Sequence, residues 1–183
     1  MPRIISLDLS LTDTGVCDLS VADSSPLVSV PASARVTRVK SKASGTSWSA
    51  LSTRIGTIVT AIKVILDSRP DLVVIESPAL GSTTGQAHSR AWLWGKVYDA
   101  VAALGIPVIT ATPQGVKMYA TGKGNADKDE VLAAVVKRYP DFDVTNNNTA
   151  DAVVLAAIGA RYLGSPIDSL AKTHLRAMDK LAK

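Results

Sequence analysis

The sequence predicts a single α/β domain, residues 1–183, in which a mixed five-stranded sheet carries helices on both faces. Apolar residues make up 46% of the chain, mostly Val, Ala, Leu and Ile, which is enough to build a core without external support. Three short strand-like runs come first, and helical segments then alternate with two continuous apolar runs. That order predicts an antiparallel meander of three strands followed by two parallel strands joined through helices.

The first half of the chain supplies the meander, a long helix and the fourth strand. Residues 4–9 and 15–21 form apolar runs joined by a polar turn, and a third run falls somewhere within residues 28–39. Apolar residues at helical spacing predict a helix over residues 47–68, which Pro70 ends. Residues 72–75 form a short apolar run that suits a strand covered on both faces.

The second half supplies the remaining helices and the last strand. A polar loop at residues 81–85 precedes a helix over residues 86–104, and residues 106–109 form a buried strand. Thr112 followed by Pro113 resembles a helix N-cap with proline at the first helical position, opening a short helix to Tyr119. A glycine-bearing loop at residues 122–125 precedes helices over residues 127–139 and 149–163, and a polar C-terminal helix follows Pro166.

Composition narrows the classes of protein to which the chain can belong. Cys17 is the only cysteine, so neither a disulfide framework nor a zinc cluster of cysteines is expected. No apolar stretch approaches the roughly 20 residues that span a bilayer, and the N-terminus lacks the pattern of a signal peptide. We therefore expect no membrane partner and a cytoplasmic location.

Basic residues gather in stretches of sequence that contain no acid. The formal net charge of +4 is small, so the distribution is more informative than the total. Cations spread over loops around a few embedded carboxylates suit a polyanion held over a metal site, although a solvated basic face would give the same pattern. The residues predicted to contact such a polyanion are Arg35, Arg38, Lys40, Lys42, Arg90, Lys117 and Lys123.

Three acids stand inside apolar surroundings. Asp8 interrupts the first strand, and alternation gives it the same face as Ser6 and Ser10, so that face is expected to be polar. Glu76 ends the fourth strand, at the strand end where ligands gather in open α/β sheets. Asp151 begins an Ala-rich helix whose small side chains allow close approach to the sheet.

Each of these positions also has a structural alternative. Asp8 could face solvent, Glu76 could be an ordinary strand-end acid, and Asp151 could stabilise a helix dipole. Asn148, three residues before Asp151, can face the same point as that acid, or it can cap the helix.

Three converging carboxylates without Cys or His are hard oxygen ligands, which favour Mg²⁺ or Mn²⁺. Two such ions serve in-line phosphoryl displacement, in which one prepares the attacking water and the other stabilises the leaving oxygen. The acids therefore predict a metal-dependent reaction at phosphate.

Four segments in order resemble the RuvC-type Holliday junction resolvases, particularly those encoded by bacteriophages. The segments are ISLDLS (residues 5–10) with Thr14-Gly15, VIESP (residues 74–78), GKGNADK (residues 122–128) with Val131, and NTADA (residues 148–152). Each motif alone is weak, but their order and spacing match over residues 2–163, nearly the whole chain. The resemblance implies a ribonuclease H-like fold and a nuclease that resolves four-way DNA junctions, leaving ligatable ends.

The resemblance also implies roles for particular residues. It makes Asp8, Glu76 and Asp151 metal ligands, with Asp8 bridging two ions, and it puts Lys128 near the scissile phosphate, where an ammonium stabilises developing charge. From spacing alone, Lys128 would be an ordinary exposed helix lysine. The resemblance further implies a homodimer formed through the helix at residues 86–104. Its apolar residues Trp92, Leu93, Val97 and Val101 either make that contact or pack on the sheet.

The sequence departs from the family pattern in two places. The usual fourth acid falls on Asn148, a weaker ligand, for which Asp13 could compensate. The aromatic wedge that normally follows the second acid is missing from residues 77–80, although Trp92, Trp94 or Tyr119 could replace it. Because stacking on an aromatic contributes about 1–3 kcal/mol per base, we expect broader action that includes forks and flaps.

Two other classes of function fit part of the sequence. A branched-DNA binding protein that lost its chemistry through Asn148 would explain the basic stretches equally well. An ATP-binding protein of the actin and sugar-kinase group would share the fold, but the chain is short for two domains and has no glycine-rich nucleotide loop.

Overall fold

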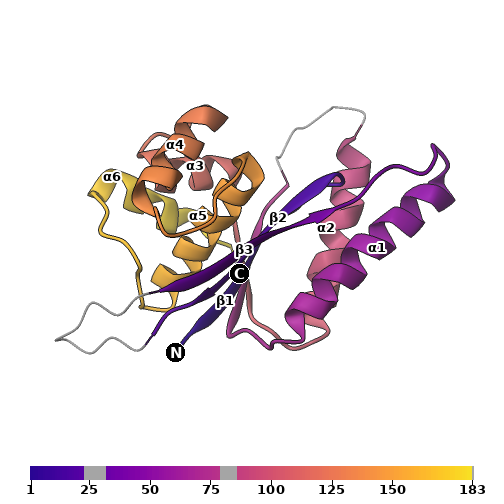
Figure 1. Ribbon diagram of the computed structural model, residues 1–183, viewed down its shortest axis with the longest axis horizontal. Helices are drawn as coiled ribbons and strands as arrows, with labels where there is room; N and C mark the ends of the chain where they lie inside the picture. Colours follow the sequence, from indigo (N-terminus) through magenta and orange to yellow (C-terminus); the bar gives the residue numbers. More distant parts are fainter. Residues whose placement is uncertain (23–31, 79–85, 183) are drawn as a thin grey trace.

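Five strands form one mixed sheet in the order β3-β2-β1-β4-β5 (Figure 1). The computed structural model describes residues 1–22, 32–78 and 86–182. Antiparallel pairing joins β1 to β2 and β2 to β3, and parallel pairing joins β1 to β4 and β4 to β5. The predicted sheet is confirmed. The strands are β1 (Arg3–Asp8), β2 (Asp13–Ser20), β3 (Ser33–Lys40), β4 (Leu72–Glu76) and β5 (Val108–Ala111).

Helices cover both faces of the sheet, as predicted (Figure 1). On one face lie α1 (Trp48–Leu66) and α2 (Ala87–Ala102), which enclose a core with Ile5, Leu7 and Ile75. The opposite face carries α5 (Asn147–Tyr162), which packs over Ile4 and Val74. The elements outside α5 are α3 (Pro113–Thr121), α4 (Lys128–Arg138), the short α6 (Lys172–Leu175) and a 3₁₀ turn (Arg176–Lys180).

Several predicted helix starts were correct because their capping residues can be recognised in the sequence. The side chain of Ser47 accepts a hydrogen bond from the backbone N–H of Ala50 at the start of α1. Thr112 caps α3 with Pro113 in its first turn, as predicted, and Asp127 forms a capping box with Glu130 at the start of α4.

Other boundaries were wrong. The fifth strand lies at Val108–Ala111 rather than residues 106–109, because Pro107 has no N–H to donate and stands at the strand entrance. The helix expected over residues 149–163 begins at Asn147, and Asn146 caps it, so Asn148 is not the N-cap. The C-terminal segment is not one polar helix but the four-residue α6 and a 3₁₀ turn. The predicted loop at residues 81–85 lies outside the described residues.

Tertiary contacts, which periodicity does not report, shape the segment that follows α5. Asp168 accepts hydrogen bonds from the Tyr119 hydroxyl at 3.0 Å and from the Arg161 guanidinium at 2.5 Å, and also from the Tyr139 hydroxyl. The carboxylate of Asp168 is almost fully buried, so this network anchors the chain against α3, α4 and α5.

One helix, α1, is long and apolar enough to cross a membrane by length and composition, contrary to the expectation from the sequence. In the fold, Ile55, Ile58, Ile62 and Leu66 turn one side of this helix into the core beneath the sheet. We therefore interpret α1 as a helix of the domain.

Small residues bring α5 close to the sheet, as predicted from Ala150, Ala157, Gly159 and Ala160. A Cβ atom placed on Gly159 would lie 2.7 Å from Val74 Cγ2 and 2.8 Å from Ile4 Cγ2. A Cβ on Gly15 of β2 would lie 2.0 Å from the main-chain oxygen of Asn148. The start and the last turns of α5 therefore both rest on the sheet where a side chain is missing.

A matched pair of Gly→Ala variants tests this close approach. G159A should lower the free energy of unfolding by about 1–3 kcal/mol, because the new methyl group overpacks the core. G56A, where nothing lies within 4 Å of the added Cβ, should raise it by about 0.8–1.0 kcal/mol through helix propensity. Urea denaturation measures both, and equal shifts in the same direction would contradict the packing.

Candidate active site

Asp8 and Glu76 are the last residues of neighbouring parallel strands, β1 and β4. Ser6 shares the α5 face of β1 with Asp8, and its hydroxyl donates to the main-chain oxygen of Ala152 at 2.6 Å. Ile4 lies on this face too and is fully buried, so the polar part of this face begins at Ser6 and does not include the start of the strand.

Asp151 reaches the two strand-end acids from above, because the first turn of α5 passes directly over Gly15. Gly15 is opposite Asp8 in the β1–β2 register, so the missing side chain leaves space for α5 next to Asp8. Helix and sheet together bring the side chains of residues 8, 76 and 151 into electrostatic contact.

Burial and neighbouring charges hinder the ionisation of the three carboxyl groups. Burial, with the charges of Asp151 and Asp13, raises the pKa of Asp8 to about 7, although Lys128 opposes the shift. Burial, with the charges of Asp8 and Asp151, raises the pKa of Glu76 to about 8. Burial raises the pKa of Asp151 to about 6 against the opposing charges of Lys128 and Lys117. Such a cluster is stabilised by a cation.

Divalent cations suit this donor set by chemistry. In the described part of the chain, no side chain donates a hydrogen bond to the carboxylates of Asp8, Glu76 or Asp151, so their oxygens are available as ligands. Across residues 1–22, 32–78 and 86–182, however, no three Asp, Glu, His or Cys side chains are grouped so that they could hold one ion. Binding therefore requires the carboxylates to turn toward the ion.

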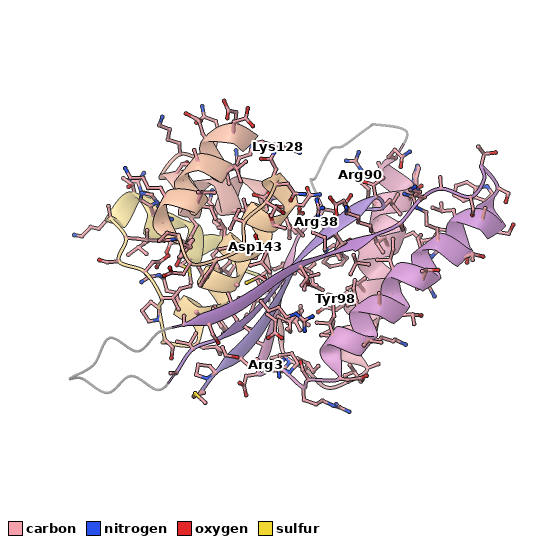
Figure 2. All side chains as sticks on the ribbon, viewed as in Figure 1. Arg3, Arg38, Arg90, Tyr98, Lys128 and Asp143 are labelled. Carbon is pink, nitrogen blue, oxygen red and sulfur yellow. The ribbon has the colours of Figure 1, made fainter. Side chains whose placement is uncertain are left out.

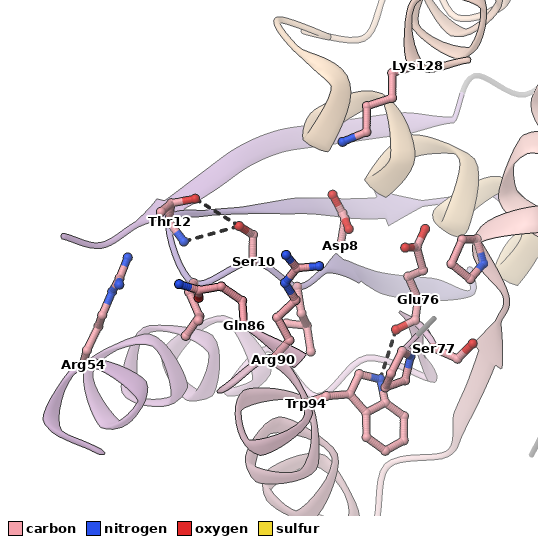
Figure 3. Close-up of a pocket in the computed structure, with 14 residues that line it drawn as sticks. Asp8, Ser10, Thr12, Arg54, Glu76, Ser77, Gln86, Arg90, Trp94 and Lys128 are labelled. Atoms are coloured by element: carbon pink, nitrogen blue, oxygen red, sulfur yellow. Dashed lines mark hydrogen bonds between the residues drawn. The ribbon is translucent and has the colours of Figure 1, made fainter. Parts of the chain in front are cut away.

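A cleft of about 510 Å³ opens over Asp8 and Glu76 (Figure 3). Lys128, the first residue of α4, is exposed, as spacing alone suggested, and it also lines the cleft. Figure 3 shows the Lys128 side chain extending from α4 toward the acids. Asp151 contributes charge but does not line the cleft.

Asn148 is engaged with β2. Its Nδ2 donates to the main-chain oxygen of Asp13 at 2.6 Å. The carboxylate of Asp13 accepts from Asn146 Nδ2 at 3.2 Å and from Arg38 at 3.1 Å, both through Oδ2. Its other oxygen, Oδ1, is buried without a hydrogen-bond partner among the described residues. The first residue of β2 therefore carries a buried hydrogen-bond acceptor, Asp13 Oδ1, without a described partner, and the charge of Asp13 acts on Asp8.

The predicted polyanion contacts do not all gather at the site. Arg90 lines the cleft, and the charge of Lys117 acts on Glu76 and Asp151. Strand alternation gives Arg38 and Lys40 the same sheet face as Asp8, whereas Arg35 points to the other face. Figure 2 shows Arg38, Arg90 and Lys128 toward one end of the sheet, with Arg3 at the other.

The remaining two contacts lie elsewhere. Lys42 is exposed beyond the end of β3. Lys123 pairs with Glu130 at 3.6 Å and lines a separate cleft with Lys137 and His174, so it does not join the acids.

Comparison with known proteins identifies the family. A match to the family described as "Crossover junction endodeoxyribonuclease RuvC" spans residues 24–159. The chain belongs to the RuvC family. The matched residues include Glu76, Lys128 and Asp151, and Asp8 precedes them.

Curated RuvC relatives extend the likeness to the rest of the chain. The crossover junction endodeoxyribonuclease RuvC of Paenarthrobacter aurescens is 32% identical over 166 residues, covering 89% of this chain and 83% of that protein. The enzyme of the same name from Rickettsia typhi is 29% identical over 126 residues, or 66% of this chain and 80% of the relative. Both relatives come from bacteria, so they do not support the expected likeness to the bacteriophage-encoded branch of the family.

Solved structures confirm the ribonuclease H-like, RuvC-type fold. Thermus thermophilus RuvC aligns with a TM-score of 0.68 at 22% identity, covering 89% of this chain and 97% of that one. The same protein in complex with a Holliday junction substrate gives a TM-score of 0.67 at 20% identity, with the same coverage. The yeast mitochondrial Holliday junction resolvase Ydc2 gives 0.55 at 12% identity.

In this RuvC-family chain, α2 uses most of its apolar side chains inside the protomer. Leu93, Val97 and Val101 are buried in the core with α1 and the sheet, so for these three residues packing on the sheet is the alternative that holds. Trp92 is half-buried and lines a groove of about 480 Å³ between α1 and α2. If α2 contacts a second subunit, the contact involves Trp92 and its exposed neighbours.

The residues expected to replace the aromatic wedge differ in where they lie. Tyr119 is fully buried and its hydroxyl bonds to Asp168, so it cannot reach DNA, contrary to one expectation. Trp94 lines the cleft, donates from Nε1 to the main-chain oxygen of Glu76 at 3.0 Å and stacks on Tyr98 with ring centroids 5.2 Å apart. Trp94 thus supports the strand end that carries Glu76.

Several residues that line the cleft were not assigned to the site from the sequence. Arg54 lies between Asp23 and Asp67, a stretch without acids, but helical spacing does not say which way an arginine on a helix turns. Ser10 and Ser77 lie inside motif segments but were given no role, and Thr12 and Gln86 belong to no motif.

Replacing Asp8 by Asn should stabilise the metal-free protein at alkaline pH. The carboxylate has a pKa of about 7 in the fold against 3.8 as the ordinary value, so the native state keeps its proton while the unfolded chain loses it. Stability therefore falls as pH rises between these values, and D8N removes that loss. In EDTA at pH 8, D8N should melt above the wild type, by about 2–4 °C per kcal/mol gained.

At pH 5 the gap between the two proteins should be clearly smaller than at pH 8, because less than half of the pH range between the ordinary pKa of 3.8 and the folded pKa of about 7 has been crossed. D129N, which changes an exposed acid on α4, serves as the control and should behave like the wild type at both pH values. Thermal melts followed by circular dichroism check this. A D8N protein that melts below the wild type at pH 8 would refute the electrostatic description.

Proposed function

We propose that this RuvC-family protein is a Holliday junction-resolving endonuclease whose Asp8, Glu76 and Asp151 hold divalent cations. One observation carries the assignment to these residues: the carboxyl groups of β1, β4 and α5 are buried with raised pKa values, the charge of Asp151 helps to raise those of Asp8 and Glu76, and no described side chain donates a hydrogen bond to them. The names of the curated relatives and the Holliday junction complex of Thermus thermophilus RuvC support the choice of substrate.

Mg²⁺ or Mn²⁺, as two ions, would supply the attacking hydroxide and stabilise the leaving oxygen of the phosphodiester. The carboxylates of Asp8, Glu76 and Asp151 would hold them; the charge of Asp151 acts on both Asp8 and Glu76, and the charge of Asp8 acts on Glu76. Trp94 holds the main chain at Glu76. The ammonium of Lys128 enters the cleft and would stabilise charge that develops on the phosphate.

Asn148 is the weakest member of the proposed ligand set. Its amide nitrogen is bound to the main chain of Asp13, so at most its oxygen can turn to an ion. Asp13 compensates in part under this proposal, because its charge acts on Asp8 and its Oδ1 has no hydrogen-bond partner among the residues described.

The DNA partner accounts for the basic residues near the cleft. We propose that Arg38, Lys40, Arg90 and Lys117 contact the phosphates of the junction, with Arg35, Lys42 and Lys123 contributing farther away. A homodimer would present two such clefts to opposed strands, with the α1–α2 side and Trp92 as the candidate contact. We propose that the protein acts in the cytoplasm on cellular DNA, or in the host cytoplasm if a bacteriophage encodes it.

Removing either strand-end carboxylate should separate binding from chemistry. D8N and E76Q should bind a four-way junction as the wild type does, but cleavage in Mg²⁺ should fall by at least about 10²–10³-fold. The measurements are gel-shift binding in Ca²⁺ and single-turnover cleavage in Mg²⁺.

D129N is the matched control, because it removes an exposed acid that neighbours Lys128 without touching the cluster. Cleavage by D8N or E76Q at the wild-type rate would show that these acids do not hold the catalytic ions. A wild-type protein that binds junctions and never cuts them, in either Mg²⁺ or Mn²⁺, would favour the non-catalytic binder.

Substrate choice should be broad, because no aromatic residue occupies positions 77–80. A wedge contributes about 1–3 kcal/mol per stacked base, so its absence should bring the rates on forks and flaps toward the rate on four-way junctions. Equal enzyme incubated with labelled four-way, fork, flap and linear DNA measures the ratios. Linear duplex should stay intact, and a large excess of four-way cleavage over fork and flap cleavage would exclude the broad specificity.

A further inference from the structure

The side of the cleft facing away from Lys128 carries its own cationic wall. Arg54 comes from α1 and Arg90 from α2, and both line the cleft with Gln86, Ser10 and Thr12. Figure 3 shows Arg54, Gln86 and Arg90 across the acids from Lys128. The helices α1 and α2 cover the sheet face opposite the one that carries α5, so the two groups of cations approach the acids from different layers.

Three segments hold Arg54 at the mouth of the cleft. Its Nε donates to Ser41 Oγ at 2.9 Å and its Nη2 donates to the main-chain oxygen of Ser41 at 3.3 Å. Ser41 in turn donates from its backbone N–H to Thr12 at 3.0 Å and from its hydroxyl to the main-chain oxygen of Leu11. One guanidinium therefore joins three segments: the end of β3, the turn that follows β1, and α1.

These hydrogen bonds leave the Arg54 guanidinium with capacity to bind a ligand. All of its recorded partners are neutral oxygens, so its positive charge is not balanced by an acid among the described residues. A guanidinium already fixed in one orientation loses little entropy when it binds, and its planar fork matches a phosphate.

Arg90 is uncompensated as well. Within the ranges that the structure describes, its guanidinium makes no hydrogen bond or ion pair. Gln86, one helical turn earlier, lines the cleft beside it and adds a neutral donor. The acids that line the cleft are Asp8 and Glu76, the proposed cation ligands, so the wall itself carries no negative group.

We propose that Arg54 and Arg90 form a second phosphate-binding site, which takes a backbone phosphate next to the scissile one on the side away from Lys128. The ligand is a phosphodiester of the cleaved DNA strand, because two separated cations with a row of amide and hydroxyl donors match a backbone rather than a base edge. This inference rests on the proposed nuclease function and extends the DNA contacts to Arg54.

Salt dependence of junction binding tests the site. Fluorescence anisotropy of a labelled four-way junction, in Ca²⁺ at several salt concentrations, should give weaker binding for R54M and for R90M. Each variant should also reduce the slope of log K against log salt by about 0.9, the value for one lost phosphate contact. K172M is the control, since the exposed Lys172 on α6 lines neither this cleft nor the groove with Trp92, and it should leave the slope unchanged.

Two further variants guard against a folding defect. R54K keeps the charge but cannot make both bonds to Ser41, so it should keep the wild-type slope while binding less tightly. R90M breaks no recorded contact of the guanidinium, so its slope reports on DNA alone. Wild-type slopes in both R54M and R90M, with wild-type protein that still cuts junctions, would overturn this site and leave the nuclease assignment intact. A wild-type protein that neither binds nor cuts junctions would instead overturn the nuclease assignment.

Discussion

The close contact between the first turn of α5 and β2 is the constraint on which the site depends. A Cβ on Gly15 would lie 2.0 Å from the main-chain oxygen of Asn148, so only glycine lets the helix come this near. Two hydrogen bonds fix the contact, one from Asn148 to the main chain of Asp13 and one from Asn146 to its carboxylate. Asp151 follows within one turn and is carried to the ends of β1 and β4.

That constraint also explains the electrostatics. Acids on two strand ends and one helix would ionise independently if they stood on separate surfaces. Packed together and largely buried, Asp8, Glu76 and Asp151 all have raised pKa values, and Lys128 and Lys117 only partly offset the effect. The fold thus keeps an unfavourable concentration of negative charge, which is the situation that a divalent cation relieves.

Much of the fold was predictable because local signals agree with the tertiary structure. Strand order follows from the sequence of apolar runs, and Ser47, Thr112 and Asp127 mark helix starts through their own side chains. Prediction failed where a contact between residues, rather than the type of each residue, decides the structure. The start of α5 was misjudged because Asn146, Asn147 and Asn148 are equivalent caps by residue type, and only the capping box with Thr149 distinguishes Asn146.

The acids could be found from the sequence because carboxylates in apolar runs are expensive to bury, so their position alone is informative. The cations could not be sorted in the same way. An exposed arginine on a helix costs little wherever it points, and only the bonds from Arg54 to Ser41 show that it turns to the cleft whereas Lys63 on the same helix does not. Tyr119 was misjudged because its hydrogen-bond partner in the folded protein, Asp168, lies 49 positions away in the sequence.

The pairing of Ala182 with β5 affects how the borders of the sheet are exposed to other copies of the protein. Ala182 pairs with Thr110 through two main-chain hydrogen bonds of 2.8 and 3.1 Å, so the outer side of β5 is partly satisfied within the same chain. At the other border of the sheet, β3 presents Arg35, Arg38 and Lys40, whose charges repel a like strand. Among the described residues, neither border of the sheet therefore offers a bare template for strand-to-strand aggregation.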